Sequence, residues 1–539
     1  MSRLDPALTR SVVVFSVFFM LLGLGLHALY RSPTFEEGSD PMLLVWLFLA
    51  TGAVLWLGRR GAVAMVDMIV TPIKRFGLGA VVALLVLALA AFMIVARYVL
   101  DAFPNSGDEI AYVLQAQTYA QGRLWAAPPP LPEAFQQFHF FVKGDKWVSE
   151  YAPGWAMALA PAVVFGLPLW IVNPFIGAAT LAVFFILARR YVSCESAWIG
   201  VLLLGASSFF VLNSSSYFSH SLTALYGVAF ALFGLRYIVR GEIWCAITAG
   251  ACIGLMGLTR TPNAVIFAVP FAIALAMTQG RRLGLFWFGL GGAPFFMALL
   301  AFNGTVTGDP LLTVQNWHKP ERFGTPSVTT INYTLQHFRR LGIWTSPVLL
   351  FGFIVAFLTV LRRRGVDFTD WIMPITVIFF LLYENNGGDQ YGPRYYFEAW
   401  PFAVLTILKV IDPILFGAER NGRAEWVSSA LIASLLFEIG YLPARLAREH
   451  SVVMQRQDVY AQAESAGLNN AIVIIANKVG VIRPWLPPDL VRNGLHVGEQ
   501  KIIYARDLGA RNARLRSQFP GRSVYVYSNG RLEVASAGR

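Results

Sequence analysis

The sequence has few charged residues and very few cysteines, and both shortages narrow the classes of protein that it can encode. Only 14% of the 539 residues are Asp, Glu, Lys or Arg, whereas a soluble domain carries about 25% charged residues. Of the three cysteines, Cys194 lies in a loop that we expect in the cytoplasm, and Cys245 and Cys252 share one apolar stretch. This spacing provides neither a disulfide framework nor a zinc site.

The sequence is rich in long apolar segments. Hydrophobic residues make up 56% of the chain, and the mean hydropathy is +0.56. Runs of about 17 to 25 apolar residues recur, each long enough to cross a bilayer as a helix. The sequence therefore predicts an all-α polytopic membrane protein with about 13 transmembrane helices. The expected spans are 11–30, 42–58, 77–100, 173–190, 196–213, 219–240, 243–258, 262–279, 284–302, 346–361, 370–385, 396–417 and 427–445.

The formal net charge of +12 is distributed as an orientation signal. Lys and Arg occur in short runs between apolar segments, as in cytoplasmic loops under the positive-inside rule, so no nucleic-acid partner is expected. All of these runs fall on one side only if the proline-rich segment 153–170 does not cross the membrane. We therefore expect a cytoplasmic amino terminus, a first external loop at 101–172 and an external carboxyl end.

The end of the chain differs in composition from the rest. Residues 446–539 are polar, with strand-like stretches such as "AIVIIAN" and a terminal "SVYVYSNGRLEV". Asn529 and Gly530 in that last stretch predict a hairpin turn. The sequence thus indicates a transmembrane domain over 1–445 and a small external α/β domain over 446–539.

The acidic pair Asp108 and Glu109 follows directly on an apolar run, and helix capping is one explanation for it. Ser106 can accept an amide hydrogen bond while Glu109 reaches back, which is the pattern of a capping box. Asp108 then adds favourable charge at the positive end of the helix dipole.

The helix that this pair begins carries a second signal. Four of its residues recur at spacings of four, three and four, so they share one helix face: Asp108, Tyr112, Gln115 and Tyr119. A polar and aromatic face suits a hydroxylated ligand better than lipid. Glu109 fits the capping role, and Asp108 is left available for chemistry.

A resemblance to a known family rests on five stretches in this order. They are "GDEIAYVLQAQTYAQGRLW", "YAPGWAMALAPAVVFG", "LARRYVSCESAWIGVLLLGASSFFVLNSSSYFSH", "GLMGLTRTPNAV" and "GPRYYFEAWPFAVL". Together they resemble membrane glycosyltransferases of the GT-C superfamily, such as aminoarabinose and protein-mannosyl transferases, over residues 90–415. The resemblance implies a GT-C fold with interfacial helices in 101–172. The hairpin 11–58 is extra relative to the minimal family pattern.

The family also implies a reaction and roles for particular residues. Such enzymes move a sugar from a polyprenyl-phosphate donor to a hydroxyl of a lipid, glycan or protein at the external face. Asp108, with Glu109 beside it, stands where the family carries its catalytic acid, and it would act as general base in an inverting displacement. Arg394, Arg260 and Tyr395 would bind the donor phosphate, since Arg donates paired hydrogen bonds to phosphate. Interfacial anchoring of both arginines remains open.

Further polar residues are expected on the external side, each with an ordinary alternative as a solvated loop residue. His220 stands where many relatives carry an acid, which weakens any case for a two-carboxylate or metal centre. Asp309 before Pro310 is typical of a turn. Some relatives use a divalent cation, so Mg²⁺ or Mn²⁺ is a possible cofactor here. The sequence does not require one, and no metal ligand is predicted. The candidate substrate-binding residues are Tyr112, Gln115, His220, Tyr151 and Asp389, with Glu150, His318 and Lys319 nearby.

Two other functions remain open at this stage. A transporter or flippase of a lipid-linked or anionic substrate would carry ionisable groups within its spans, and Glu438 in the last span is one such group. An envelope assembly protein would work through the external tail. The distribution of apolar and basic residues suits a bacterial inner membrane with the carboxyl-terminal domain in the periplasm, surrounded by membrane lipids.

Overall fold

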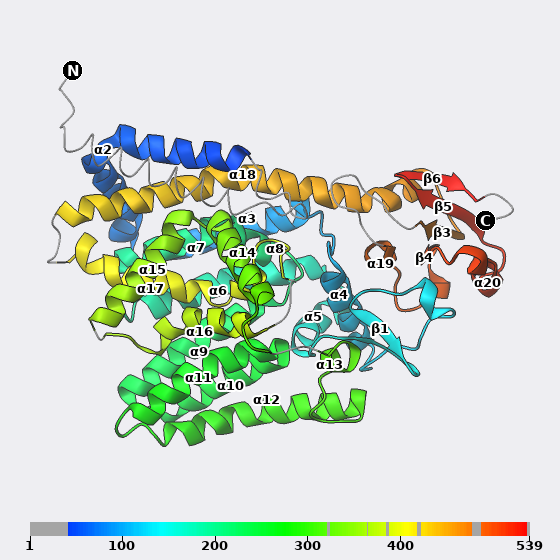
Figure 1. Cartoon of the computed structure of the whole chain (residues 1–539), viewed down its shortest axis with the longest axis horizontal. Helices are drawn as coiled ribbons and strands as arrows, with labels where there is room; N and C mark the ends of the chain where they lie inside the picture. Colours follow the sequence, from blue (N-terminus) through cyan, green and yellow to red (C-terminus); the bar gives the residue numbers. More distant parts are fainter. Residues whose placement is uncertain are drawn as a thin grey trace.

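The computed structural model describes residues 41–320, 324–363, 365–383, 388–417, 422–476 and 487–535. The expected first span, 11–30, lies outside these ranges. In the described part, a bundle of helices makes up most of the molecule, and the long helix α18 (Gly422–Ser465) leads from one flank of the bundle to a small sheet at the carboxyl end (Figure 1).

The helices follow the apolar runs of the sequence. From the amino-terminal side they are α2 (Pro41–Phe76), α3 (Leu78–Ile94), the π-helical turn η2 (Val95–Val99), α4 (Gly107–Ala120), α5 (Gly154–Val164), α6 (Val172–Ala188), α7 (Cys194–Ala206), α8 (Ser208–Ser215) and α9 (His220–Arg240). After these come α10 (Ile243–Thr259), α11 (Thr261–Met277), α12 (Gly284–Thr307), α13 (Val314–His318), α14 (Val328–Trp344), α15 (Pro347–Arg362), α16 (Phe368–Leu382), α17 (Trp400–Leu415) and α18.

The strands and the remaining short helices lie in the first loop and at the carboxyl end. The loop contains η3 (Pro132–Ala134), β1 (Phe140–Lys143), β2 (Lys146–Ser149) and η4 (Leu169–Ile171), and η5 (Arg394–Tyr396) precedes α17. The carboxyl end contains β3 (Ala471–Ile475), α19 (Pro487–Leu490), η6 (Val497–Glu499), β4 (Ile502–Arg506), η7 (Gly509–Arg511), α20 (Asn512–Gln518), β5 (Ser523–Ser528) and β6 (Arg531–Val534).

Five described helical segments are long and apolar enough to cross a membrane, or seven if each of two bent helix pairs counts as one span. The bends are 65° between α7 and α8 and 116° between α14 and α15. α10, α11 and α16 are apolar but shorter. The molecule thus has the helices of a polytopic membrane protein, and the count of about 13 spans stays a prediction.

Three expected boundaries differ from the observed ones. The run 196–213 is not one straight helix, because Ser207 has extended backbone angles (φ −70°, ψ 136°) and its hydroxyl caps α8 by accepting from the Phe210 amide. The external stretch 303–345 is not simply a loop, since it contains α13 and the amphipathic helix α14. α18 continues without a break past residue 445, so the expected boundary at 446 falls inside a helix.

The segment 153–170 forms a helix too short to cross a bilayer. α5 has 11 residues, which rise about 16 Å at 1.5 Å per residue, whereas the hydrocarbon core is about 30 Å thick. Pro153 directly precedes the helix and Pro161 lies within it. These observations agree with the expectation that this segment does not span.

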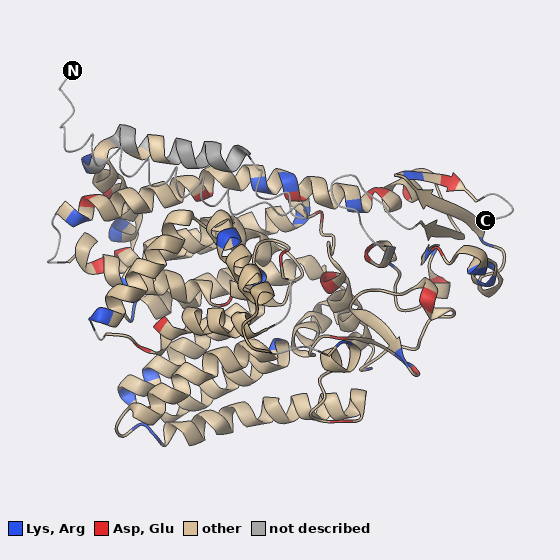
Figure 2. Ribbon diagram, in the orientation of Figure 1, with Lys and Arg blue, Asp and Glu red and all other residues tan. Residues whose placement is uncertain are grey.

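Basic residues gather at one end of the helical bundle, away from the carboxyl-terminal sheet (Figure 2). Lys74 and Arg75 end α2, Arg240 ends α9 and Arg362 ends α15. This distribution is the one that the positive-inside rule predicts for a single cytoplasmic face. The candidate site must therefore be sought at the opposite ends of the helices, which face the first loop and the carboxyl-terminal sheet.

The carboxyl-terminal sheet is mixed and has the strand order β4-β3-β5-β6. β3 is parallel to β4 and β5, and β5 and β6 form the expected antiparallel hairpin. Asn529 and Gly530 both have positive φ angles, 51° and 74°, as a two-residue primed turn requires.

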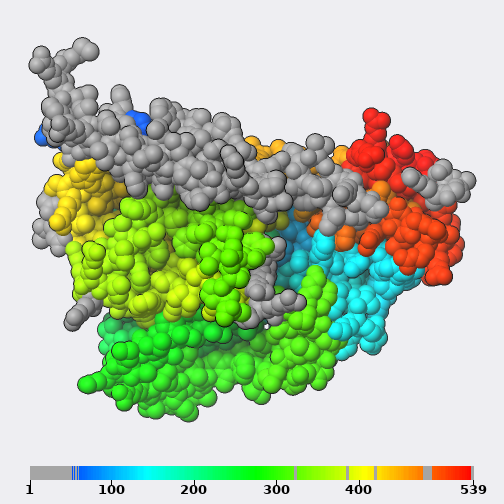
Figure 3. All heavy atoms as spheres, viewed as in Figure 1, coloured from blue at the N-terminus to red at the C-terminus, as the bar shows by residue number. Residues whose placement is uncertain are grey.

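This sheet shares a hydrophobic core with the first loop. Ile110 and Leu114 of α4 and Phe140 and Trp147 of the β1–β2 hairpin are buried in one cluster with Ile474 and other residues of the sheet. In the space-filling view, the orange and red carboxyl-terminal atoms pack against the cyan atoms of this loop (Figure 3). The carboxyl-terminal region therefore helps to hold the first loop, which contains Asp108.

Candidate active site

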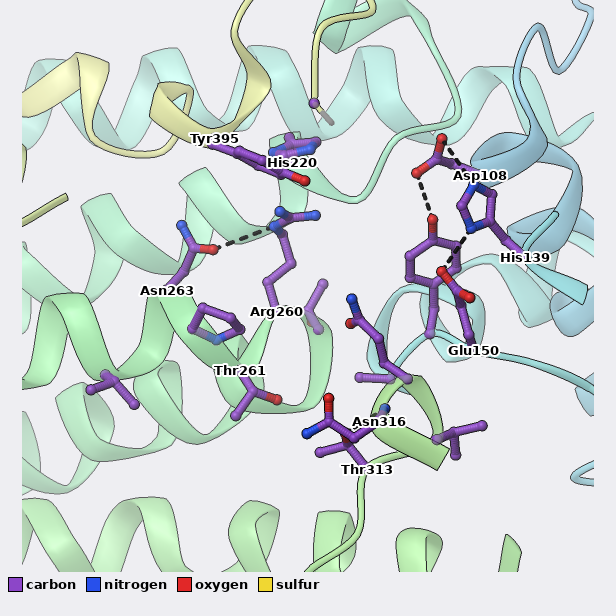
Figure 4. A pocket seen from close by; sticks show the side chains of 18 of the residues that line it. Asp108, His139, Glu150, His220, Arg260, Thr261, Asn263, Thr313, Asn316 and Tyr395 are labelled. Carbon is purple, nitrogen blue, oxygen red and sulfur yellow. Dashed lines mark hydrogen bonds and ion pairs between the residues drawn. The ribbon is translucent and has the colours of Figure 1, made fainter. Parts of the chain in front are cut away.

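A cavity of about 450 Å³ lies where the ends of the helices opposite the basic runs meet the first loop. Its walls come from α4, the segment around β2, the start of α9, the α10–α11 junction, α12, α13, the end of α16 and η5. Charged and polar residues form two groups on its walls (Figure 4). Asp108, His139 and Glu150 lie on one side, and Arg260, Asn263, His220 and Tyr395 lie on the other.

Asp108 is positioned by the amino terminus of α4. The Ser106 hydroxyl accepts a hydrogen bond from the Glu109 amide, which is one half of the predicted capping box. The return contact to the Ser106 amide is not made, because the Glu109 carboxylate accepts from the Tyr217 amide. The Asp108 carboxylate accepts a hydrogen bond of 2.5 Å from the Tyr151 hydroxyl, and its Oδ2 lies 3.8 Å from the guanidinium of Arg394. The side chain remains 23% exposed, so it can meet a ligand in the cavity.

The β1–β2 hairpin adds two partners to this acidic side. Its antiparallel register places His139 opposite Glu150, whose amide donates to the His139 carbonyl. His139 Nδ1 lies 2.7 Å from Glu150 Oε1, and its Nε2 lies 3.9 Å from Asp108 Oδ2. The other oxygen of Glu150 lies 2.6 Å from His318 Nδ1. Asp108 therefore stands at the end of a chain of four acidic and imidazole groups.

The protonation of these groups follows from their neighbours. Burial alone would raise the pKa of Asp108, but the positive charge of Arg394, the imidazole of His139 and the Tyr151 hydroxyl lower this pKa to about 2. Burial also opposes ionisation of Glu150, and hydrogen bonds from His139 and His318 overcome it and lower the pKa of Glu150 to about 2. Burial would lower the pKa of His139, but the two carboxylates raise it. Both acids are therefore ionised at neutral pH.

Arg394 enters the cavity from a tightly folded loop. Gly388, Tyr391 and Gly392 have φ angles of 83°, 56° and 92°, so the chain turns sharply just before η5. The Tyr391 carbonyl accepts from Asn213, and the Arg394 guanidinium stacks 3.7 Å above the Phe218 ring. These contacts fix the direction of Arg394 toward Asp108.

Arg260 occupies the junction between α10 and α11. Its Nε lies 3.3 Å from Asn263 Oδ1 and 3.4 Å from Glu398 Oε1, and its guanidinium lies 5.9 Å from the centre of the Tyr395 ring. Glu398 is fully buried. His220, at the start of α9, also contacts this carboxylate, with 2.9 Å between Nδ1 and Oε1.

Most of the residues predicted from the sequence do meet in this cavity. Arg260 and Arg394 both lie on its wall, so the structure brings the two predicted phosphate ligands together with the predicted base. The predicted residues on the wall are Asp108, Tyr112, Glu150, Tyr151, His220, Arg260, Arg394 and Tyr395.

Three predicted residues do not line the cavity. The carboxylate of Glu109 is buried and accepts a hydrogen bond from the Tyr217 amide, and burial raises its pKa to about 7. Gln115 donates to the Tyr119 hydroxyl and to the Tyr151 carbonyl. Asp389 turns away and pairs with Arg340 and His337 of α14.

Two further residues behave as ordinary structural groups. Asp309 is exposed, and its carboxylate accepts from the Leu311 amide in a turn. Glu438 is buried in α18 and is not part of the cavity wall.

Sequence reasoning missed His139, Glu398 and Asn263. A signal for His139 existed, because "FHFFVKGDKWVSEY" has the pattern of a hairpin whose Gly-Asp turn aligns His139 with Glu150. Glu398 falls in an apolar run and is separated from its partners by well over a hundred residues. Nothing in its local sequence marks it as part of a site.

The described residues do not fit a divalent cation at this site. None of them form a group of three or more His, Cys, Asp and Glu side chains that could hold a metal ion. The oxygens of Asp108 and Glu150 are engaged by Tyr151, His139 and His318.

Two solved structures resemble this chain over nearly its full length. ArnT from Cupriavidus metallidurans bound to undecaprenyl phosphate is 14% identical with a TM-score of 0.54, and the similarity covers 84% of this chain and 97% of ArnT. The apo state of the same protein has a TM-score of 0.52 at 14% identity, covering 83% and 93%. No family of known sequences and no curated protein matches the chain. At 14% identity, this similarity shows that the chain has the fold of ArnT.

Proposed function

We propose that this protein is an integral-membrane glycosyltransferase that moves a sugar from a polyprenyl-phosphate donor to an acceptor hydroxyl at the external face of the membrane. One observation carries the proposal: a carboxylate and two arginines converge on a single cavity, with 3.8 Å between Asp108 and Arg394. Sugar transfer needs a base for the acceptor and positive charge for the leaving phosphate. The ArnT fold, seen elsewhere with undecaprenyl phosphate bound, supports the same class of donor.

The proposed reaction is a direct displacement at the anomeric carbon. The acceptor oxygen attacks this carbon and forms the new glycosidic bond, while the bond from the carbon to the phosphate oxygen breaks. Asp108 takes the proton of the acceptor hydroxyl, and polyprenyl phosphate leaves with the bonding electrons. Attack from the opposite face inverts the configuration at the anomeric carbon.

Donor binding would also prepare the base. The charge of Arg394 helps to keep the pKa of Asp108 at about 2, which makes the carboxylate a weak base. A donor phosphate that takes up the hydrogen bonds of Arg394 and Arg260 neutralises this charge, and the pKa of Asp108 rises. Asp108 would thus become more basic when the donor is in place.

The remaining cavity wall suits a lipid-linked sugar. Apolar side chains line it from α11, α12 and α16, including Val265, Leu299, Phe302 and Phe380. α12 and α16 also expose apolar residues such as Phe296 and Ile378 on their surfaces. A prenyl chain could therefore reach the arginines from the bilayer, while Tyr112 and Tyr151 contact the sugar or the acceptor.

We further propose a bacterial inner membrane, with the basic ends of the helices in the cytoplasm and the cavity and carboxyl-terminal sheet in the periplasm. The acceptor would be a lipid, glycan or protein hydroxyl. Glu109 would support the active site by holding the chain before α9 through Tyr217. Asp389 would act through α14 and the loop of Arg394.

A donor panel tests the proposal directly. Purified protein in lipid vesicles is incubated with radiolabelled polyprenyl-phosphate sugars and membrane extract, and the label is followed into new products. Transfer of one label supports the proposal. Movement of a labelled donor between leaflets without transfer would identify a flippase instead and overturn it.

A further inference from the structure

The buried carboxylate of Glu398 is placed to act on the cavity without facing it. Its exposed fraction is 0%, and it does not lie on the cavity wall. Two side chains that do line the wall contact the same oxygen: His220 through Nδ1 at 2.9 Å and Arg260 through Nε at 3.4 Å. One hidden acid thus lies behind two residues of the site.

The way in which Arg260 is held matters for phosphate binding. The polar contacts of its guanidinium with described residues go to Nε, from Asn263 Oδ1 at 3.3 Å and from Glu398. The guanidinium lies between Asn263 and the group of Asp108, His139 and Glu150 (Figure 4). Anchoring at Nε leaves the two terminal nitrogens toward the cavity, which is the pair that binds two phosphate oxygens at once.

Glu398 forms an ion pair with Arg260, with 3.4 Å between its Oε1 and the Nε of Arg260. In its ionised form this carboxylate only accepts hydrogen bonds, so His220 donates to it from Nδ1, whereas the Nε–H of Arg260 donates to Asn263 Oδ1. The partly buried positive charge of Arg260 is then compensated by an ionised acid that lies outside the cavity wall. The front of the guanidinium is left for an incoming anion.

We infer that Glu398 is a positioning residue. Together with His220 and Asn263, it orients Arg260 as a bidentate ligand for the phosphate of a polyprenyl-phosphate donor. This inference rests on the proposed function and assigns a role to a residue that does not touch substrate. It requires that Glu398 act only through Arg260.

A double-mutant cycle on the full-length protein tests this requirement. The probe is undecaprenyl phosphate in lipid nanodiscs, with its dissociation constant measured by quenching of tryptophan fluorescence. Glu398→Gln keeps the side-chain shape and removes the charge, so we expect binding to weaken about tenfold or more. Arg260→Lys keeps the positive charge but removes the paired guanidinium donors, so it should weaken binding similarly. The double variant should bind no more weakly than Arg260→Lys alone.

Kinetics and controls separate positioning from a general structural effect. Glu398→Gln should raise the KM for the donor while kcat changes less than KM. Glu398→Asp, which keeps the charge on a shorter side chain, should lie between wild type and Glu398→Gln, and it serves if Glu398→Gln does not fold. Glu464→Gln, an exposed acid on α18, should bind like wild type.

The outcomes distinguish this inference from the proposed function. Unchanged binding in a folded Glu398→Gln variant, or an effect that adds in full to that of Arg260→Lys, would overturn the positioning role. If the wild type binds the lipid phosphate but transfers no sugar from any donor, the proposed reaction fails while the positioning role can still be supported by the cycle. A wild-type protein that does not bind the lipid phosphate overturns both.

Discussion

The two sides of the cavity are built in different ways. The acidic side, with Asp108, His139 and Glu150, comes from one short helix and a hairpin of four-residue strands. Its hydrophobic support is the small cluster shared with the carboxyl-terminal sheet. On the basic side, Arg260 lies between two apolar helices and Arg394 in the loop before α17, and both are supported by the large core of the bundle.

The acidic and basic sides of the cavity are thus supported by different hydrophobic cores. The large apolar core supports Arg260 at the junction of α10 and α11, and it supports Arg394 in the turn that leads into α17. The acidic side is folded like a soluble domain, through a helix cap, a tight turn and a compact core. Substitutions that destabilise the carboxyl-terminal sheet should therefore disturb the position of Asp108 more than that of Arg260.

The largest effect should come from the proposed base. Asp108→Asn keeps the size of the side chain but removes its basicity, so we expect sugar transfer to fall about 10²- to 10⁴-fold. Donor binding should change much less, because the arginines remain. The measurement is transfer of radiolabel in vesicles, with Asp309→Asn as a matched control in an exposed turn. Full activity of Asp108→Asn at normal membrane insertion would refute the catalytic assignment.

Arg394→Gln should produce a smaller loss and a shift in pH dependence. Losing charge-assisted hydrogen bonds to phosphate should lower transfer about 10- to 100-fold at neutral pH. It also removes a cation that lowers the pKa of Asp108 to about 2. The ionised base is present above this pKa and is lost as pH falls through it, so the acid limb of the pH–rate profile should move to higher pH.

Arg123→Gln, which changes an exposed arginine in the first loop just after α4, is the control for Arg394→Gln. It should leave both the rate and the acid limb unchanged. An unshifted acid limb in Arg394→Gln would mean that Arg394 and Asp108 are not coupled in the working enzyme.

The dependence of the acidic side on the carboxyl-terminal sheet can be tested with paired core variants. Ile110→Ala removes a side chain from the shared cluster on α4, and Ile266→Ala removes one from the large core on α11. Each should cost about 2 to 5 kcal/mol of stability. Limited proteolysis should cut the carboxyl-terminal region faster in Ile110→Ala only. Equal cleavage in both variants would contradict the shared core.

The smallest expected effect concerns the helix cap. Ser106→Ala removes the acceptor for the Glu109 amide, and it should destabilise α4 by about 1 kcal/mol. A thermal unfolding curve followed by circular dichroism should show a slight decrease in midpoint, with transfer largely retained. A loss of activity as great as that of Asp108→Asn would show that Ser106 does more than cap the helix.

Particular parts of this protein followed from the sequence by itself. Apolar runs predicted most of the helices, because a chain segment in lipid must satisfy its backbone hydrogen bonds internally. Local patterns predicted the start of α4 at Ser106 and the terminal hairpin at Asn529 and Gly530. The basic runs also predicted which helix ends would meet, and this placed Asp108, Arg260 and Arg394 on a common side.

Other features were decided only by the tertiary structure. The partnership of Glu398 with His220 and Arg260 depends on three helix ends that packing brings together. Asp389, five residues from Arg394, pairs with α14 because the intervening loop reverses its direction. Local sequence encodes caps, turns and apolar faces, but long-range contacts between polar groups arise only once the helices have packed. The apolar helices of a polytopic membrane protein were therefore predictable from the sequence, and the arrangement of polar groups within the site was not.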